Sequence, residues 1–336
     1  MKDILQKLLQ KQDLTDQEAM FAFDAIMDGQ ATPAQLGGFL TAMRMKGETP
    51  SEIAAAASSM RRHAVFVDPR GKPVVDTCGT GGDSLGTFNI STTAAFIVAG
   101  AGVPVAKHGN RSITSKCGSA DVLAELGVNL DAPPDVMEES IHEVGIGFLF
   151  AAKLHPAMKH AMGPRRELGF RTIFNLLGPL TNPAGAKSQV LGVFAPEMTE
   201  VFADVLRRLG SHRVFVVHGR DGMDEITTTT TTRVSELRDG SVKTYNLDPL
   251  EFLDHYAKPD DLRGGDPATN AGLLRAVLSG EKGPRRDIAC LNAAAGIVAG
   301  GKAADLRAGF QAACESVDSG RALLALDGLV RKSRNG

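Results

Sequence analysis

The sequence predicts an α/β protein, in which a small all-helical domain precedes a mostly parallel sheet flanked by helices. Three observations lead to this class. Helix-start signatures repeat through the first part of the chain, and short β-branched runs alternate with helical segments from residue 65 onward. Alternation of this kind is typical of parallel sheets covered on both faces. A glycine cluster also follows the first β-branched run, at the strand end where such sheets bind ligands.

Three capping boxes mark the helices expected near the N-terminus. They begin at Thr15, Thr32 and Thr49, each with Glu or Gln three residues later. The hydroxyl and the later side chain satisfy each other's backbone donors, which makes the pattern a strong helix-start signal. Gly29 and Gly47 are placed as helix ends, because glycine tolerates the left-handed conformation found there. We therefore expect a helical bundle in this region.

These patterns divide the chain into two domains. We expect a helical domain over residues 1–70 and an α/β domain over 71–336, with the segment around 160–185 packing beside the first. A helical unit of this size is more often a packing or subunit-contact surface than a ligand site.

Five strands and five helices are expected after residue 70. The strands are predicted at 74–75, 103–106, 146–150, 190–194 and 214–217, and the helices begin near Ser91, Ser119, Pro134, Met198 and Ala268. Because ligands collect at the carboxyl ends of such strands, the glycine cluster and the loop after the second strand are expected to form one site. The six-threonine run 227–232 is typical of a β-prone segment beside a loop, and we assign it no chemistry.

Composition narrows the functional classes. The 336 residues carry 37 basic and 39 acidic side chains, and a net charge of -2 offers no broad surface for nucleic acid. The four cysteines are widely spaced without a CxxC pair, which fits a reducing cytoplasm better than a disulfide framework or a zinc site. No uncharged apolar stretch approaches the roughly 20 residues of a membrane span. We expect a cytoplasmic protein with no nucleic-acid and no membrane partner.

An anion cradle is predicted in residues 74–93, VVDTCGTGGDSLGTFNISTT. Glycines that can adopt positive φ let backbone N–H groups approach a ligand, and a helix start with its positive dipole end follows. The residues concerned are Gly79, Gly81, Gly82, Asn89, Ser91 and Thr92. The spacing excludes a nucleotide-triphosphate P-loop, because no Gly-Lys-Ser/Thr follows the turn. An ordinary glycine-rich turn with a hydroxyl cap is the alternative.

Two further loops supply charge for a pyrophosphate site. The segment after the second strand, KHGNRSITSKCGSAD, carries Lys107, Arg111 and several hydroxyls, which suit phosphate oxygens. The loop after the fifth strand carries Asp224 and Glu225, and two carboxylates beside a pyrophosphate require a hard cation such as Mg²⁺ between them. Either loop alone is an ordinary solvated surface, so the metal follows only if the loops converge.

A basic segment and a rigid bend complete the candidate site. Residues 153–171 carry five Lys or Arg and one acid, which indicates a small anionic substrate. His155 and His160 lie five residues apart, off the spacing of a helical metal pair. Gly-Pro and Asn-Pro turns between 178 and 183 suggest a ligand-facing bend rather than a regular helix.

Taken together, the motifs resemble the anthranilate phosphoribosyltransferase family, and the likeness runs almost end to end. The resemblance rests on residues 79–83 (GTGGD), 89–92 (NIST), 107–111 (KHGNR), 118–121 (GSAD), 165–167 (RRE), 174–183 (FNLLGPLTNP) and 222–225 (GMDE). The resemblance implies a fold of the nucleoside phosphorylase/phosphoribosyltransferase type, usually a homodimer through the helical domain. It also implies transfer of phosphoribosyl from 5-phosphoribosyl diphosphate to anthranilate with Mg²⁺, releasing pyrophosphate, in tryptophan biosynthesis.

The resemblance implies three groups of site residues. The diphosphate substrate would be held by Gly79, Gly82, Asp83, Thr87, Asn89, Ile90, Ser91, Thr92, Lys107, His108, Gly109, Asn110, Arg111, Ser112, Ile113, Thr114, Ser115 and Ser119. Magnesium would be reached by Ser91, Asp224 and Glu225. Anthranilate would be contacted by Asn110, Arg165 and the Gly79 backbone, with His108, His155, Gly178 and Pro179 lining its channel.

No dedicated nucleophile or base is expected for such a reaction. Displacing pyrophosphate builds positive character on the sugar and negative charge on the leaving group, so a cation and aimed donors carry most of the catalysis. An aryl amine sheds its proton easily after attack, and Arg165 would act by positioning the carboxylate. The chain departs from the family pattern at Ala152, where proline is common, and in the threonine run.

Two alternatives stay open on the sequence. A pyrimidine nucleoside phosphorylase resembles this fold and has a glycine-rich phosphate turn, although that family is longer and spaces its glycines differently. A non-catalytic relative that binds nucleic acid would keep the fold, but it should be basic and should lack the pair Asp224 and Glu225.

Overall fold

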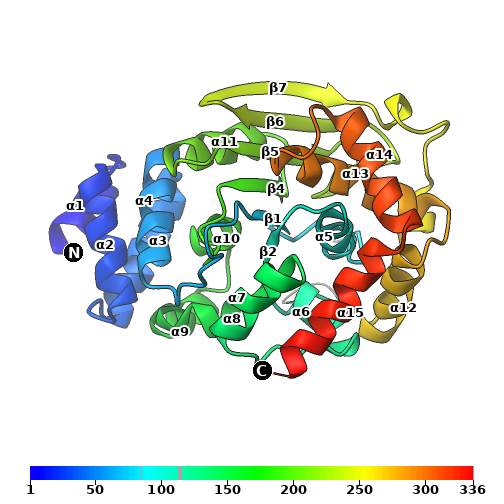
Figure 1. Cartoon of the computed structure of the whole chain (residues 1–336). Helices are drawn as coiled ribbons and strands as arrows, with labels where there is room; N and C mark the ends of the chain where they lie inside the picture. The colour runs from blue at the N-terminus through cyan, green and yellow to red at the C-terminus, as the bar shows by residue number, and fades with distance from the viewer. Residues whose placement is uncertain (84, 113–115, 336) are drawn as a thin grey trace.

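The computed structural model describes residues 1–83, 85–112 and 116–335 (Figure 1). Within these ranges, one sheet of seven strands runs in the order β3-β2-β1-β4-β5-β6-β7. The first five strands in this order are parallel, and β6 and β7 are antiparallel additions at one edge. The predicted fold class, a mostly parallel sheet flanked by helices with a small helical domain, is confirmed.

The strand bounds differ in part from those predicted. The strands are β1 (Val75–Gly79), β2 (Val105–Gly109), β3 (Ile146–Phe150), β4 (Ser188–Gly192), β5 (Arg213–Gly219), β6 (Thr232–Arg238) and β7 (Ser241–Leu247). Only the prediction for β3 matches to the residue; the other four were too short or shifted. Strands β1 and β2 continue into polar residues because each pairs with a parallel neighbour on both sides. Lys107, His108 and Gly109 consequently lie in β2 rather than in the loop after it.

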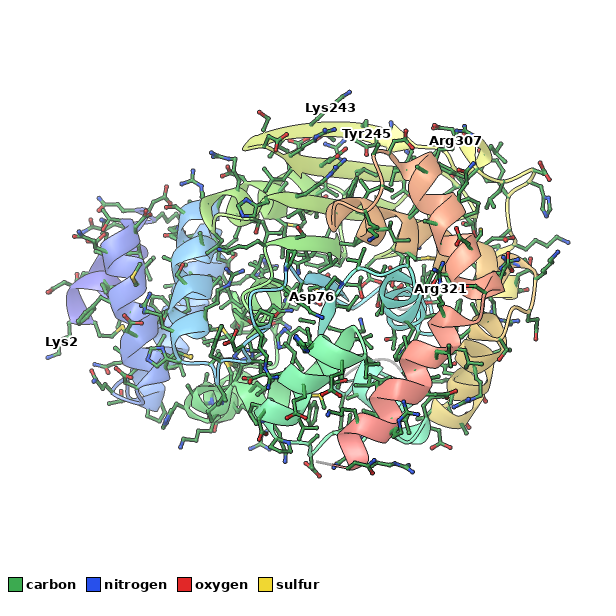
Figure 2. All side chains as sticks on the ribbon, viewed as in Figure 1. Lys2, Asp76, Lys243, Tyr245, Arg307 and Arg321 are labelled. Atoms are coloured by element: carbon green, nitrogen blue, oxygen red, sulfur yellow. The ribbon has the colours of Figure 1, made fainter. Side chains whose placement is uncertain are left out.

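The hairpin formed by β6 and β7 was not predicted. Its turn at Asp239 and Gly240 has positive φ at both residues, 50° and 78°, the pattern of a two-residue hairpin turn. Strand β7 forms the edge of the sheet and carries mostly polar side chains, so it lacks the apolar run of a buried strand. Figure 2 shows Lys243 and Tyr245 of β7 at this outer edge of the molecule.

Four helices open the chain and form the helical region at the left of Figure 1. They are α1 (Lys2–Leu9), α2 (Asp16–Met27), α3 (Pro33–Lys46) and α4 (Pro50–Arg62). The three predicted capping boxes are confirmed at Thr15, Thr32 and Thr49, and Gly47 ends α3 with a φ of 88°. Helix α1 is additional to the three helices predicted.

Two later helices complete the core of this region. Helix α9 (Lys159–Leu168) packs on α2 and α3, and α10 (Phe174–Leu177) packs on α4. The Phe23 ring lies edge to face against Phe39 and Phe174, with ring centroids 5.4 and 6.0 Å apart. The segment that carries Arg165 is thereby anchored to the helical region.

Helices cover both faces of the sheet. They are α5 (Ile90–Gly100), α6 (Ser119–Glu125), α7 (Pro134–Glu143), α8 (Ala151–Leu154), α11 (Met198–Arg208), α12 (Pro267–Leu278), α13 (Pro284–Ala299), α14 (Leu306–Asp318) and α15 (Arg321–Arg334). Alternate strand residues face opposite cores: Val190 and Phe215 pack with α13, whereas Leu191 and Val214 pack with α11 and the helical region. No helix in the described ranges has both the length and the apolar character needed to span a membrane.

Candidate active site

The candidate site lies where the parallel strands end. Strands β1 and β4 end level with each other, since Gly79 pairs with Gly192, and β5 continues past Val217, the partner of Gly192, to Gly219. Residues 220–231, which we call the acid loop, connect β5 to β6 and pass this edge. The carboxyl ends of these strands are the position at which open α/β sheets bind ligands.

The glycine turn, the start of α5 and the acid loop meet here through direct hydrogen bonds. The backbone N–H of Gly81 donates to Asp224 Oδ2 at 2.9 Å. The backbone N–H of Ser91, in the first turn of α5, donates to Glu225 Oε1 at 3.0 Å. Segments separated by more than a hundred residues in the chain are thus joined at a single edge of the sheet.

Glycine is required at this edge because the acid loop passes so close to the strands. A Cβ on Gly192 would lie 1.6 Å from the carbonyl oxygen of Asp224, and one on Gly79 would lie 2.9 Å from Asp224 Oδ2. Gly81 and Gly82 adopt positive φ of 67° and 91°, which side chains other than glycine rarely tolerate. These constraints favour a built anion cradle over an ordinary glycine-rich turn.

The acid pair is held in a buried, mutually repulsive setting. Burial, followed by repulsion from Asp83, raises the pKa of Asp224 to about 7. Burial, followed by repulsion from Asp224, raises the pKa of Glu225 to about 8, against the opposing effect of the Lys107 charge. Three carboxyl groups therefore gather where their negative charges destabilise one another.

This donor set fits a divalent cation that also binds substrate phosphate. The described residues include no group of three or more His, Cys, Asp or Glu side chains arranged to hold a metal unaided. Mg²⁺ typically takes one or two carboxylates and completes its octahedron with water and substrate phosphates. A cation beside Asp224 and Glu225 would relieve the repulsion that raises their pKa values.

Lys107 lies beneath the acid pair rather than in a solvent loop. Its ammonium group donates to the carbonyl oxygen of Thr77, and its side chain is buried. Burial lowers the pKa of Lys107, while the negative charge of Asp76 acts in the opposite direction. Asp76, near the centre of the molecule in Figure 2, accepts a hydrogen bond from the His108 N–H at 3.0 Å. A buried amine therefore lies beside the cradle, and the charges of Asp76 and Glu225 favour its protonated form against the effect of burial.

The segment after β2 folds onto the start of α6. Asp121 accepts from Arg111 Nη1 at 2.9 Å, from the Ser112 N–H at 3.0 Å and from the Gly118 N–H at 2.9 Å. Ser119 Oγ donates to the carbonyl oxygen of Asn110 at 3.3 Å. The Arg111 side chain is thus paired with a carboxylate in the first turn of α6. The predicted contacts Ile113, Thr114 and Ser115 lie outside the described residues.

The remaining cradle residues divide into backbone and side-chain contributors. Thr87 forms an isolated β-bridge with Arg263, and Asn89 precedes α5 with its Oδ1 accepting from Asn270 Nδ2 at 2.9 Å. The side chains of Ile90 and Thr92 are buried, and the Ile90 N–H donates to the Phe88 carbonyl oxygen at 2.8 Å, which leaves the backbone of Thr92 to face a ligand. Asn270, which holds Asn89, is a supporting residue that sequence reasoning did not identify.

His108 and His155 form a neutral pair beside the 178–180 bend. His108 Nδ1 lies 3.1 Å from the Gly178 carbonyl oxygen, so this nitrogen carries the proton and donates. The two Nε2 atoms lie 3.2 Å apart, which requires the His155 Nε2–H to donate to His108. Burial lowers the pKa of His108 to about 3 and that of His155 to about 4. Neither ring acts as a cation at neutral pH.

This pair is expected to make the protein acid-sensitive. The unfolded chain takes up protons on both rings below a pH of about 6.5, whereas the folded chain does not until about pH 3 to 4. The contribution of these two histidines to the free energy of unfolding should therefore fall as the pH drops from 7 to 5, by on the order of 2 kcal/mol for each. Urea unfolding of wild type and of His155→Gln across this range measures it.

The control for this measurement is His142→Gln, at an exposed position on α7. It should keep the wild-type pH slope, whereas His155→Gln should lose roughly half of the slope due to the pair. Equal slopes for all three proteins would contradict the assignment of neutral buried rings.

The bend at 178–180 is a 3₁₀ turn (Gly178–Leu180) that follows the four-residue helix α10, so no regular helix runs through the Gly-Pro and Asn-Pro turns. Its three carbonyl groups each accept a hydrogen bond from a side chain elsewhere in the fold. His108 Nδ1 donates to Gly178, Gln189 Nε2 donates to Pro179 at 2.6 Å, and Arg61 Nε donates to Leu180 at 2.7 Å. These three hydrogen bonds restrain the bend, and its role as a ligand-facing element stays a prediction.

Two arginines near the site have no carboxylate partner within the described residues. The Arg165 guanidinium lies 5.1 Å from the centroid of the Phe174 ring, and burial lowers its pKa. The Arg171 guanidinium lies 4.8 Å from the Phe194 ring centroid, and its Nη2 borders Gly82. Arg171 was not singled out from the sequence, because only the fold brings it to the cradle.

Cys78 is poorly suited to nucleophilic attack. Gln189 Nε2 donates to its sulfur at 2.9 Å, and burial raises the pKa of the thiol well above its ordinary value. A thiol that stays protonated is a weak nucleophile. This environment is compatible with the expectation of no dedicated nucleophile, which stays a prediction.

Two family models cover this architecture. The helical bundle domain of a glycosyl transferase family matches residues 2–64, and the α/β domain of the same family matches residues 71–323. The chain is therefore a two-domain glycosyl transferase.

Individual relatives define the family more narrowly. Anthranilate phosphoribosyltransferases of Desulfosudis oleivorans and Syntrophobacter fumaroxidans are each 56% identical to the chain, covering 98% of both sequences. The crystal structure of this enzyme from Thermus thermophilus superposes with a TM-score of 0.93, at 46% identity and with 99% of both chains covered. The chain belongs to the anthranilate phosphoribosyltransferase family.

A more distant relative was solved with ligands. The anthranilate phosphoribosyltransferase of Saccharomyces cerevisiae, in complex with PRPP and Mg, has a TM-score of 0.89 at 28% identity, covering 99% of this chain and 98% of that one. Neither the nucleoside phosphorylase nor the nucleic-acid-binding alternative is supported by these relatives.

Proposed function

We propose that the protein transfers the phosphoribosyl group of 5-phosphoribosyl diphosphate to the amine of anthranilate. The products are N-(5-phosphoribosyl)anthranilate and pyrophosphate, and the reaction is a step of tryptophan biosynthesis. The observation that carries this proposal is the meeting of the glycine turn, the start of α5 and the acid pair at one edge of the sheet. That arrangement supplies backbone donors for phosphate beside carboxylates for a cation.

We propose that the diphosphate lies along the cradle between β1, α5 and the loop after β2. The residues proposed to hold it are Gly79, Gly82, Asp83, Thr87, Asn89 to Thr92, Lys107 to Ser115 and Ser119, in backbone or side-chain contact. The helix start and the buried Lys107 favour negative charge there. Arg171, unpaired and beside Gly82, adds a further cation to this proposal.

We propose Ser91, Asp224 and Glu225 as the residues that hold Mg²⁺ together with the diphosphate. The cation supplies positive charge that stabilises the departing pyrophosphate. The PRPP and Mg complex of the yeast relative supports this choice of metal. Within the chain, the N–H groups of Gly81 and Ser91 each fix one oxygen of these two carboxylates.

Anthranilate is proposed to bind between Arg165 and the 178–180 bend. The Arg165 guanidinium would receive the carboxylate, and Asn110 with the Gly79 backbone would place the amine against the ribose. His108, His155, Gly178 and Pro179 would line the approach. The neutral histidines add no charge to repel or trap the aromatic acid. The complexes of the yeast relative with 4-fluoroanthranilate support a ligand of this class.

The reaction is tested by following anthranilate fluorescence. The fluorescence of anthranilate should fall only when the enzyme, 5-phosphoribosyl diphosphate and Mg²⁺ are all present. Omission of the metal or of the phosphoribosyl donor should leave the signal constant. An unchanged signal in the complete mixture would contradict the proposal, and phosphate-dependent cleavage of thymidine would favour the phosphorylase alternative.

We further propose that residues 1–70 and 71–336 are separate domains, and that the enzyme is a cytoplasmic homodimer formed through the first. Three large apolar side chains of the helical region are exposed, Leu9 by 74 %, Phe21 by 58 % and Met45 by 73 %. Burial of such side chains between subunits would remove them from water. The free cysteines are compatible with a reducing compartment.

Sedimentation equilibrium is expected to give twice the mass of the chain for wild type. The double variant Phe21→Glu, Met45→Glu should shift the enzyme to a monomer, because two buried carboxylates oppose association. Leu324→Glu is the matched control, since Leu324 is 67 % exposed on α15 in the α/β part of the molecule. A wild-type monomer at micromolar concentration would refute the dimer.

A further inference from the structure

The acid loop carries two adjacent carboxylates, Asp224 and Glu225, each hydrogen-bonded to the backbone of another segment. The N–H groups of Gly81 and Ser91 account for one oxygen of each carboxylate. The backbone that carries them needs separate anchors, and the structure provides two.

The first anchor is Asn292 of α13. Its Oδ1 accepts from the Ile226 N–H at 2.9 Å, and its Nδ2 donates to the Ile226 carbonyl oxygen at 2.9 Å. The same Nδ2 also donates to the Ile288 carbonyl oxygen of α13 at 2.9 Å, which fixes the orientation of the amide. Asn292 is only 2% exposed, so both bonds are shielded from water. Ile226 directly follows Glu225 and is therefore locked to a rigid helix.

The second anchor is the threonine run itself. Asp221 Oδ2 accepts hydrogen bonds from the hydroxyls of Thr227, at 2.6 Å, and of Thr229. Asp221 Oδ1 accepts from the Met223 N–H at 3.1 Å, and the Thr227 N–H donates to the Thr232 hydroxyl at 3.0 Å. These hydrogen bonds close the acid loop on itself, from Asp221 before the acid pair to Thr227 and Thr229 after it.

We propose that Asn292 and the hydrogen-bond network of Asp221, Thr227 and Thr229 are positioning residues. They hold the acid pair in the arrangement that binds the divalent cation. The inference rests on the proposed function, in which Asp224 and Glu225 reach Mg²⁺. With the backbone fixed on both sides, the carboxylates can adjust only by side-chain rotation, and less reorganisation is needed on binding. The threonine run thereby acquires a role that composition alone does not indicate.

Asn292 could instead serve only to pack α13 against the sheet, and the two roles predict different results. A packing role lowers the melting temperature without changing metal affinity. A positioning role weakens the metal even in molecules that are fully folded. Ser316→Ala is the matched control, because Ser316 Oγ also makes a buried bond to a backbone carbonyl, that of Ile97 at 2.8 Å, away from the acid loop.

The test measures Mn²⁺ binding by electron paramagnetic resonance, with and without 5-phosphoribosyl diphosphate, in wild type, Asn292→Ala, Thr229→Val and Ser316→Ala. Mn²⁺ affinity should fall about 10- to 100-fold in Asn292→Ala and less in Thr229→Val, as is typical when a group that orients a metal ligand is lost. The Mg²⁺ concentration for half-maximal turnover should rise in parallel, while turnover at saturating Mg²⁺ stays within about threefold of wild type. Ser316→Ala should lose thermal stability only.

Unchanged Mn²⁺ affinity in folded Asn292→Ala, whatever its melting temperature, would overturn the proposal. If circular dichroism shows that Asn292→Ala does not fold, the Thr229→Val variant provides the test. Unchanged Mn²⁺ affinity in Thr229→Val would then overturn the proposal, and weakened Mn²⁺ affinity would support it. Absence of turnover in wild type is a separate result, because it refutes the proposed function whatever the variants bind.

Discussion

Replacing Asp224 by Asn and Glu225 by Gln together should lower kcat by about 10³-fold or more while leaving the protein folded. The two carboxylates lie at the meeting point of the glycine turn and α5, held by the N–H groups of Gly81 and Ser91. Their amide isosteres keep the size and part of the hydrogen bonding, but they cannot neutralise a divalent cation. The loss should therefore appear in catalysis and in metal dependence.

The stability of the same double variant should equal or exceed that of wild type in metal-free buffer. The folded-state pKa values, about 7 for Asp224 and about 8 for Glu225, lie above the unfolded values near 4. Between those limits the folded chain binds more protons at these two carboxyl groups, so their contribution to the free energy of unfolding of wild type falls as the pH rises from about 4 to 8, opposite in sign to the contribution of His108 and His155. The amides do not titrate, and they remove this penalty.

Steady-state turnover over a range of Mg²⁺ concentrations, together with thermal melts at pH 5 and pH 8, measures both effects. Asp327→Asn is the control, because Asp327 pairs with Arg275 at the surface at 3.3 Å, on α15. It should leave turnover unchanged. Wild-type rates in the double variant at limiting Mg²⁺, or a marked loss of its stability at pH 8, would contradict the role assigned to the pair.

The parts of the fold that could be predicted are those set by local chemistry. The capping boxes at Thr15, Thr32 and Thr49 need only neighbours three residues away, and all three form. The strand at 146–150 is a short apolar run and also matches. Strands β6 and β7 were not predicted, because apolar and polar residues alternate only weakly along them. They also add to one edge of the sheet, where polar side chains are tolerated.

The sequence could predict only those parts of the site that the order of the parallel strands brings together. The carboxyl ends of parallel strands share an edge, so loops after them can be expected to converge, as the bonds from Gly81 and Ser91 to the acid pair show. Asn292 and Arg171 come from other parts of the fold, and their pattern carries no signal of the acid loop or of Gly82. Burial also decides roles that residue type cannot, since only the backbone of Thr92 can face a ligand.

Arg165→Gln is expected to lower kcat/KM for anthranilate about 100-fold or more, with the KM for 5-phosphoribosyl diphosphate unchanged within about twofold. The guanidinium is half-buried over the Phe174 ring at 5.1 Å, and burial lowers its pKa without a carboxylate of the described chain to compensate. A charged group left in this condition gains most from an incoming carboxylate. Arg165→Lys should recover only part of the loss, because an ammonium group cannot bind both carboxylate oxygens in one plane.

Aniline, which has the amine but no carboxylate, separates recognition from general damage to the site. Wild type should use it far less well than anthranilate, and Arg165→Gln should lose most of that preference, because its defect is confined to the substrate that carries the carboxylate. Arg166→Gln, at the exposed neighbouring position, removes the same charge from α9 and should behave as wild type with both amines. If Arg165→Gln slowed both amines equally, the arginine would be acting on the shape of α9 and α10 instead of on the carboxylate.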